Sequence, residues 1–239
     1  FPLNSIMRSD GTIDAQLFPG FARLASGSTW YRNATAAALR TFYAVPAILT
    51  GRYPHGARLP VAREYPQNLF TLLGGTYDVD ADETITRLCT KDVCGDDARG
   101  GEGATSELLD AASSTYGTMI APDEPRVVVS ESVEEATNSI MAGNGRSSQR
   151  IARFERFLAS LGPASRPSAR PSLHFLHILL PHGPSQYYAS GARYGTGGAP
   201  VGRGGGHGDT WTADAGLVAL ARQRHLLQVQ FADHLVSRM

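Results

Sequence analysis

The chain has 239 residues, and its 22 lysines and arginines balance its 22 aspartates and glutamates. A hydrophobic fraction of 42% with 18% charged residues is typical of a globular protein and excludes a disordered chain. A net charge of zero gives no support to binding of nucleic acid or of an acidic membrane. The longest apolar runs, 42–49 and 173–180, are well short of the roughly 20 residues that a membrane span needs, so no transmembrane helix is predicted.

The first predicted element is a helix after residue 17. Phe18, Phe21 and Leu24 recur about one helical turn apart, so they would share one apolar face of this helix. Residues 28–35 are rich in β-branched and aromatic side chains, which is typical of a short strand or an extended run.

The apolar segment 41–50 predicts a second helix, because Gly51 follows it as a stop signal. Pro46 lies inside the segment, and proline is tolerated in the first turn of a helix but not in its interior. Two alternatives follow: the helix begins just before Pro46, or Thr41 lies on a turn that leads into it.

The middle of the chain predicts short elements. Residues 66–75 are typical of a short capped helix closed by glycines, and residues 77–80 of a strand. Residues 91–105 are acidic and glycine-rich, so they predict a surface loop. Residues 126–130 predict another short strand.

The last third predicts an α/β fold. Residues 149–161 form an amphipathic helical pattern, and the proline-rich residues 163–171 predict a linker. Residues 172–180 are apolar on both faces, which favours a strand buried in a central sheet. A glycine-rich loop at 191–209 precedes a long amphipathic helix at 213–239. Because strands alternate with helices, we expect a central sheet flanked by helices within a single domain over residues 1–239.

The two cysteines, Cys89 and Cys94, are five positions apart. No further cysteine or nearby histidine completes a zinc set. They form either a small disulfide-closed loop, which implies an oxidising compartment, or two free thiols in a polar loop. The polar neighbours Lys91 and Asp92 favour the disulfide, because free thiols are usually buried.

Polar side chains at the ends of apolar elements mark two candidate sites, since α/β proteins usually place their sites there. Thr41 is either a helix cap or a nucleophile activated by the positive end of the helix dipole. His177 is either a core histidine or a ligand, whereas His182 lies in a Pro-His-Gly-Pro turn that does not resemble a core.

Four motifs together resemble the sulfatase-like hydrolase/transferase family of the alkaline phosphatase superfamily. They are Trp-Tyr-Arg-Asn-Ala-Thr at 30–35, Val-Pro-Ala-Ile-Leu-Thr-Gly-Arg-Tyr-Pro at 45–54, Leu-His-Ile-Leu-Leu-Pro-His-Gly-Pro at 176–184 and Arg-His-Leu-Leu-Gln at 224–228. The chain is most similar to membrane-anchored, extracytoplasmic members from actinobacteria, and the resemblance covers nearly all of it. It implies an alkaline-phosphatase-like fold that is incomplete at both ends.

The resemblance implies that Thr41, nine residues before Thr50, is the nucleophile. True sulfatases have cysteine or serine there, with proline and arginine at the second and fourth following positions, where this chain has Tyr43 and Val45. Threonine cannot be converted to formylglycine, because its hydroxyl carbon carries a methyl group. The resemblance therefore implies direct attack by the Thr41 alkoxide on a phosphate or sulfate ester.

The resemblance also implies a divalent metal (Zn, Mn, Mg or Ca) that contacts Thr41 and is held by carboxylates outside this chain. We expect an Asp-Glu pair before Phe1 and an Asp-His-Gly motif after Met239, so that this chain alone is inactive. His182 matches a family position that contacts the substrate anion, and His177 is a second candidate for substrate binding.

The substrate implied is a small-molecule, lipid or glycan ester, without nucleic acid as a partner. The expected location is extracytoplasmic, with membrane attachment only through segments outside the chain. The alternative is a truncated or degenerate member that serves as a non-catalytic binding or structural module.

Overall fold

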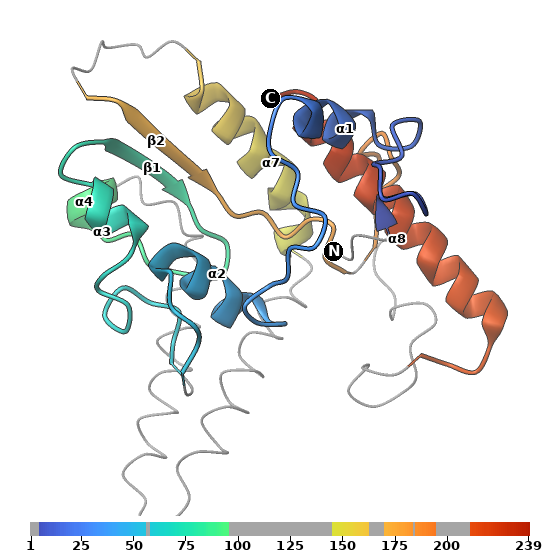
Figure 1. The fold of residues 1–239 in the computed structure, drawn as a ribbon, viewed down its shortest axis with the longest axis horizontal. Helices are drawn as coiled ribbons and strands as arrows, with labels where there is room; N and C mark the ends of the chain where they lie inside the picture. The colour runs from blue at the N-terminus through green and yellow to red at the C-terminus, as the bar shows by residue number, and fades with distance from the viewer. Residues whose placement is uncertain (1–4, 56–57, 96–144, 163–169, 184, 195–210) are drawn as a thin grey trace, which may run out of the picture. The chain divides into compact units, whose positions relative to one another are not determined.

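The structure, a computed structural model, describes residues 5–55, 58–95, 145–162, 170–183, 185–194 and 211–239. The chain divides into two compact units, residues 35–178 and a unit that combines residues 1–34 with 179–239. The described residues form helices and a small parallel sheet, which is an α/β architecture (Figure 1).

The sheet belongs to the unit of residues 35–178 and consists of β1 (Asp78–Asp82) and β2 (Ser172–Leu176), which pair in parallel. The strand predicted at 77–80 is confirmed. The strand predicted at 172–180 is shorter, and its residues are half-buried or exposed rather than fully buried. It ends at Leu176 because β1 ends opposite it, and the last bond between the two segments runs from the His177 N–H to the Asp82 carbonyl (2.9 Å).

The two faces of β1 differ in character, as the alternation of side chains along a strand requires. Val79 and Ala81 face a core to which α2 (Thr41–Thr50), α3 (Leu69–Leu73) and α4 (Lys91–Cys94) contribute. The aspartates face the other way, and each has a basic or imidazole partner. The pairs are Asp78 with Arg170 (3.4 Å), Asp80 with His174 (3.4 Å) and Asp82 with Arg153 (3.0 Å).

Helix α2 begins at Thr41 and ends at Gly51, which takes the left-handed conformation (φ 68°) that suits glycine. Pro46 lies inside the helix, so both alternatives offered by the sequence are wrong. Proline has no N–H, and the Phe42 carbonyl therefore lacks its helical partner. Pro46 is fully buried with its neighbours Val45 and Ala47, and this burial offsets the lost hydrogen bond.

The short helix predicted at 66–75 is confirmed as α3. The Asn68 side chain accepts hydrogen bonds from the N–H groups of Phe70 (2.9 Å) and Thr71 (3.2 Å), which caps the helix. The loop predicted at 91–105 is wrong for its first residues, because α4 occupies Lys91–Cys94. The remainder of that prediction, from residue 96 onward, lies outside the described residues.

Helix α7 (Gly145–Ser160) confirms the helix predicted at 149–161 and begins earlier. Phe154 and Phe157 are buried, whereas Leu161 beyond the helix is exposed. Figure 1 shows α7 running beside β2, with α3 and α4 beside β1.

The second unit contains α1 (Pro19–Ser26) and α8 (Ala215–Val236), which confirm the predicted helices. The buried Asp233 carboxylate of α8 accepts hydrogen bonds from the N–H groups of Gly20 (3.0 Å) and Phe21 (2.6 Å) and so caps α1. Leu24 is exposed and does not share the buried face predicted for it. Residues 28–35 form turns and irregular structure, not a strand.

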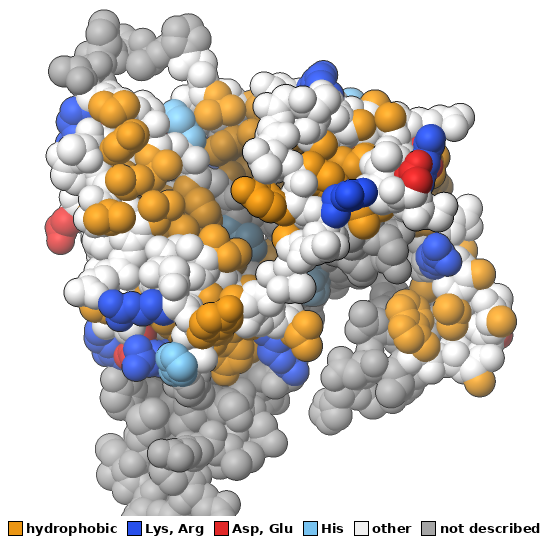
Figure 2. Space-filling model, in the orientation of Figure 1, with side chains coloured by type: hydrophobic (Ala, Val, Ile, Leu, Met, Phe, Trp, Pro, Cys, Tyr) orange, Lys and Arg blue, Asp and Glu red, His pale blue; other side chains and the backbone are white. Residues whose placement is uncertain are grey.

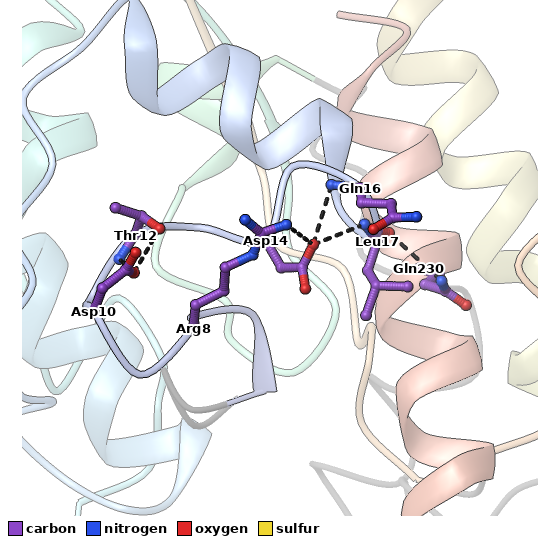
Figure 3. Close-up of polar contacts among 7 residues, drawn as sticks. All are labelled: Arg8, Asp10, Thr12, Asp14, Gln16, Leu17 and Gln230. Carbon is purple, nitrogen blue, oxygen red and sulfur yellow. Dashed lines mark hydrogen bonds and ion pairs between the residues drawn. The ribbon is translucent and has the colours of Figure 1, made fainter.

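The segment before α1 is held by aspartate side chains (Figure 3). Asp14 accepts hydrogen bonds from the N–H groups of Gln16 (3.1 Å) and Leu17 (3.2 Å) and from the Arg8 guanidinium (3.0 Å). The hydrogen bond from Arg8 lowers the pKa of Asp14. These contacts lead the chain into Phe18, which is buried at the start of α1.

Three predictions fall wholly or mostly outside the described residues: the strand at 126–130, the linker at 163–171 and the glycine-rich loop at 191–209. Among the helices of the described ranges, none has the length and apolar character needed to span a membrane.

Candidate functional site

Thr41 is the first helical residue of α2, and Arg40 occupies the N-cap position with extended backbone (φ −106°, ψ 136°). The Arg40 side chain makes no capping hydrogen bond, and the Arg40 carbonyl accepts from the N–H groups of Tyr43 (3.0 Å) and Ala44 (2.8 Å). Thr41 therefore does not act as a cap, the first role that its residue type suggested. Its half-buried side chain lies at a helix end that favours negative charge.

His182 lies in the other unit, in an exposed turn that α8 holds in place. The side chain of Gln228, which is fully buried, donates to the carbonyls of Pro181 (2.9 Å) and His182 (2.7 Å). Its oxygen accepts from the Gln186 N–H (2.9 Å). The buried Gln228 amide thus holds the carbonyls before and after the His182 side chain, and this turn presents the His182 imidazole.

A charged cluster lies where β1 and β2 end, in the unit of residues 35–178. The guanidinium of Arg153, on α7, is 3.0 Å from the Asp82 carboxylate, and both side chains are buried. Arg153 also donates to the Thr84 hydroxyl (2.6 Å), which in turn donates to the His177 carbonyl. The guanidinium therefore ties α7 to the ends of both strands.

Glu83, the residue after β1, is also buried and organises the following turn. Its carboxylate accepts from the N–H groups of Leu88 (2.9 Å) and Cys89 (2.9 Å) and from the Thr86 hydroxyl (2.6 Å). Such charge-assisted bonds are stronger than neutral ones. They position Cys89, which the structure joins to Cys94 in a disulfide, the pairing that the sequence favoured.

His177 follows β2, and its Nδ1 atom is buried without a hydrogen-bond partner among the residues that the structure describes. Burial, with the nearby positive charge of Arg153, lowers the pKa of His177 to about 4. Its imidazole is therefore neutral at pH 7. In the described part of the chain, no hydrogen bond joins it to Thr41.

The lowered pKa of His177 predicts a pH-dependent stability. The unfolded imidazole binds a proton near pH 6.5 and the folded one only near pH 4, so acid favours the unfolded state. The contribution of the neutral His177 imidazole to the unfolding free energy is complete above pH 6.5 and is lost as the pH falls toward 4. We expect His177 to lower the unfolding free energy by about 2 kcal/mol between pH 7 and pH 5.

Urea unfolding at both pH values measures this effect. The drop in unfolding free energy between pH 7 and pH 5 should be about 2 kcal/mol smaller in His177→Gln than in the wild type. It should be unchanged in His55→Gln, which alters an exposed histidine of the same unit. Equal losses in wild type and His177→Gln would contradict the prediction.

Within the described ranges, no three side chains of His, Cys, Asp or Glu are grouped so that they could hold a metal ion. The resemblance implies carboxylate ligands outside this chain, so the described residues do not test the expected metal. No protein-family model matches the chain, and neither a curated protein nor a solved structure matches it.

Sequence reasoning missed the cluster of Asp82, Glu83 and Arg153 and the role of Gln228. A signal existed for Asp82 and Glu83, because these adjacent carboxylates lie two and three positions after the predicted strand 77–80. No local signal pointed to Arg153 or Gln228, since each acts on residues far away in the sequence.

Proposed function

We propose that the chain is the core of a sulfatase-like hydrolase or transferase that acts on phosphate or sulfate esters, with Thr41 as the nucleophile. The observation that carries the proposal is the position of Thr41, a hydroxyl in the first turn of α2. The N-terminus of a helix stabilises both an alkoxide and an approaching oxyanion. The spacing of the family motifs, nine residues from Thr41 to Thr50, points to the same residue.

In this proposal the Thr41 oxygen attacks the phosphorus or sulfur atom, and the ester oxygen leaves with the alcohol. Water then releases the group from Thr41 in a hydrolase, and an acceptor alcohol does so in a transferase. His182 contributes a contact to the substrate anion from its rigid turn, with His177 as a second candidate for that role.

The divalent metal of this family would need ligands from outside the described residues, so its carboxylates belong in the proposal to the rest of the full-length protein. The Cys89–Cys94 disulfide supports an extracytoplasmic location, because disulfides persist in oxidising compartments. Membrane attachment, in this proposal, comes from segments outside the chain.

The proposal predicts a covalent intermediate on Thr41. The full-length protein is incubated with a nitrophenyl phosphodiester or a nitrophenyl sulfate, quenched in acid and digested, and the peptides are analysed by mass spectrometry. We expect the transferred group on Thr41 and not on Thr50 of the same helix. A modified residue elsewhere, or turnover without any adduct on Thr41 under rapid quench, would contradict the proposal.

A further inference from the structure

A pocket of about 410 Å³ lies beside the end of α2, in the unit of residues 35–178. This volume lies within the range of small-ligand pockets. Figure 2 shows Arg side chains and a His side chain gathered in the part of the view where Figure 1 draws α2 and the chain after it. The pocket is lined by Thr50, Arg52, His55, Arg58, Glu64, Tyr65, Pro66 and Gln67.

The charge of the pocket is positive. Arg52 and Arg58 contribute two permanent positive charges. Glu64 supplies one negative charge, and its carboxylate lies 3.5 Å from the Arg63 guanidinium. The carbonyl end of α2 adds about half a negative charge, too little to offset both guanidinium groups.

Hydrogen bonds position both the backbone and the guanidinium of Arg52. Gly51 turns the chain out of the helix, and the Arg52 N–H donates to the Thr50 hydroxyl (3.3 Å). One guanidinium nitrogen donates to the Gln67 side-chain oxygen (2.8 Å). A guanidinium has five N–H donors in a planar fork, so the remaining donors can bind an oxyanion at two points.

Tyr65 and Pro66 also line the pocket, and Tyr65 is half-buried. Burial raises the pKa of Tyr65, and the positive charge of Arg58 near the phenol opposes that rise. These two side chains give the pocket apolar atoms for the carbon part of a ligand, beside the arginines that would bind its charged part.

We propose that this pocket binds a phosphate or sulfate group, carried on a small organic ligand, through Arg52 and Arg58. The site is separate from Thr41, because the helical rise places Thr50 about 13 Å from Thr41 along α2. The proposed anion binding does not depend on Thr41 being a nucleophile.

The test is calorimetric titration of the full-length protein with inorganic phosphate and with sulfate, at constant ionic strength with chloride as the compensating anion. Arg52→Gln and Arg58→Gln should each weaken binding about tenfold, because each removes charge-assisted hydrogen bonds. Arg222→Gln, the same change of charge at an exposed position of α8, should bind as the wild type does. Thermal unfolding checks that each variant is folded.

A further variant separates the possible results. Gln67→Leu keeps every charge but removes the contact that orients Arg52, so we expect it to weaken binding by a smaller factor. Equal weakening in all three arginine variants, or no measurable binding by the wild type, would overturn the proposal.

Discussion

Replacement of Thr41 by alanine should lower the turnover of phosphate or sulfate esters by the full-length protein by at least about 10³-fold, because it removes the proposed nucleophile. The fold should be retained. The Thr41 side chain is half-buried and Thr41 is not the N-cap residue, and alanine favours a helix more than threonine does. The measurement is the steady-state rate with nitrophenyl esters, with circular dichroism as the check on folding.

Thr41→Ser is the matched variant, since it keeps a hydroxyl at the start of α2. It should retain measurable turnover, whereas a serine that is as inactive as the alanine would point to a structural role for the methyl group. If Thr41→Ala turns over esters at the wild-type rate, the assignment of the nucleophile is wrong. A non-catalytic binding or structural role then becomes the better explanation.

Replacement of Arg153 by methionine should lower the unfolding free energy by about 3–5 kcal/mol. Methionine preserves much of the side-chain volume but removes the guanidinium that lies 3.0 Å from the buried Asp82 carboxylate. It also removes the hydrogen bond to the Thr84 hydroxyl and with it the link between α7 and the strands. Denaturant unfolding at pH 7 measures the loss.

The matched control is Arg156→Met, the same substitution one helical turn later at an exposed position of α7. It should change stability by less than about 0.5 kcal/mol. The double variant Arg153→Met with Asp82→Leu should be more stable than the sum of the single losses predicts, because both members of the buried ion pair are then removed together. Equal losses at positions 153 and 156 would contradict the importance of the buried pair.

Helix starts and stops were predictable where a nearby residue encodes them. Asn68 and Gly51 mark the ends of α3 and α2 through contacts within a few residues, and both signals proved correct. Pro46 misled the prediction, because local propensity forbids a proline there while burial against the core permits it.

The extent of β2 was not predictable from its own residues. Its apolar pattern continues to residue 180, but a strand extends only as far as its partner does, and β1 ends at Asp82. Of the two alternatives for residues 28–35, a short strand or an extended run, the strand is absent for a related reason, since β-branched side chains form a strand only where another strand pairs with them.

The sequence by itself determined the α/β class, the helix boundaries near their signals and the closeness of the two cysteines, since each depends on residues near one another in the chain. Only the tertiary structure decided which groups meet at the sites. Arg153 reaches Thr84 across 69 positions, and Gln228 reaches the carbonyl of His182 across 46. The lowered pKa of His177 likewise comes from burial in the folded chain and from the charge of Arg153 on α7. Hydrogen-bond partners and desolvation are properties of the folded neighbourhood, and local propensity does not encode them.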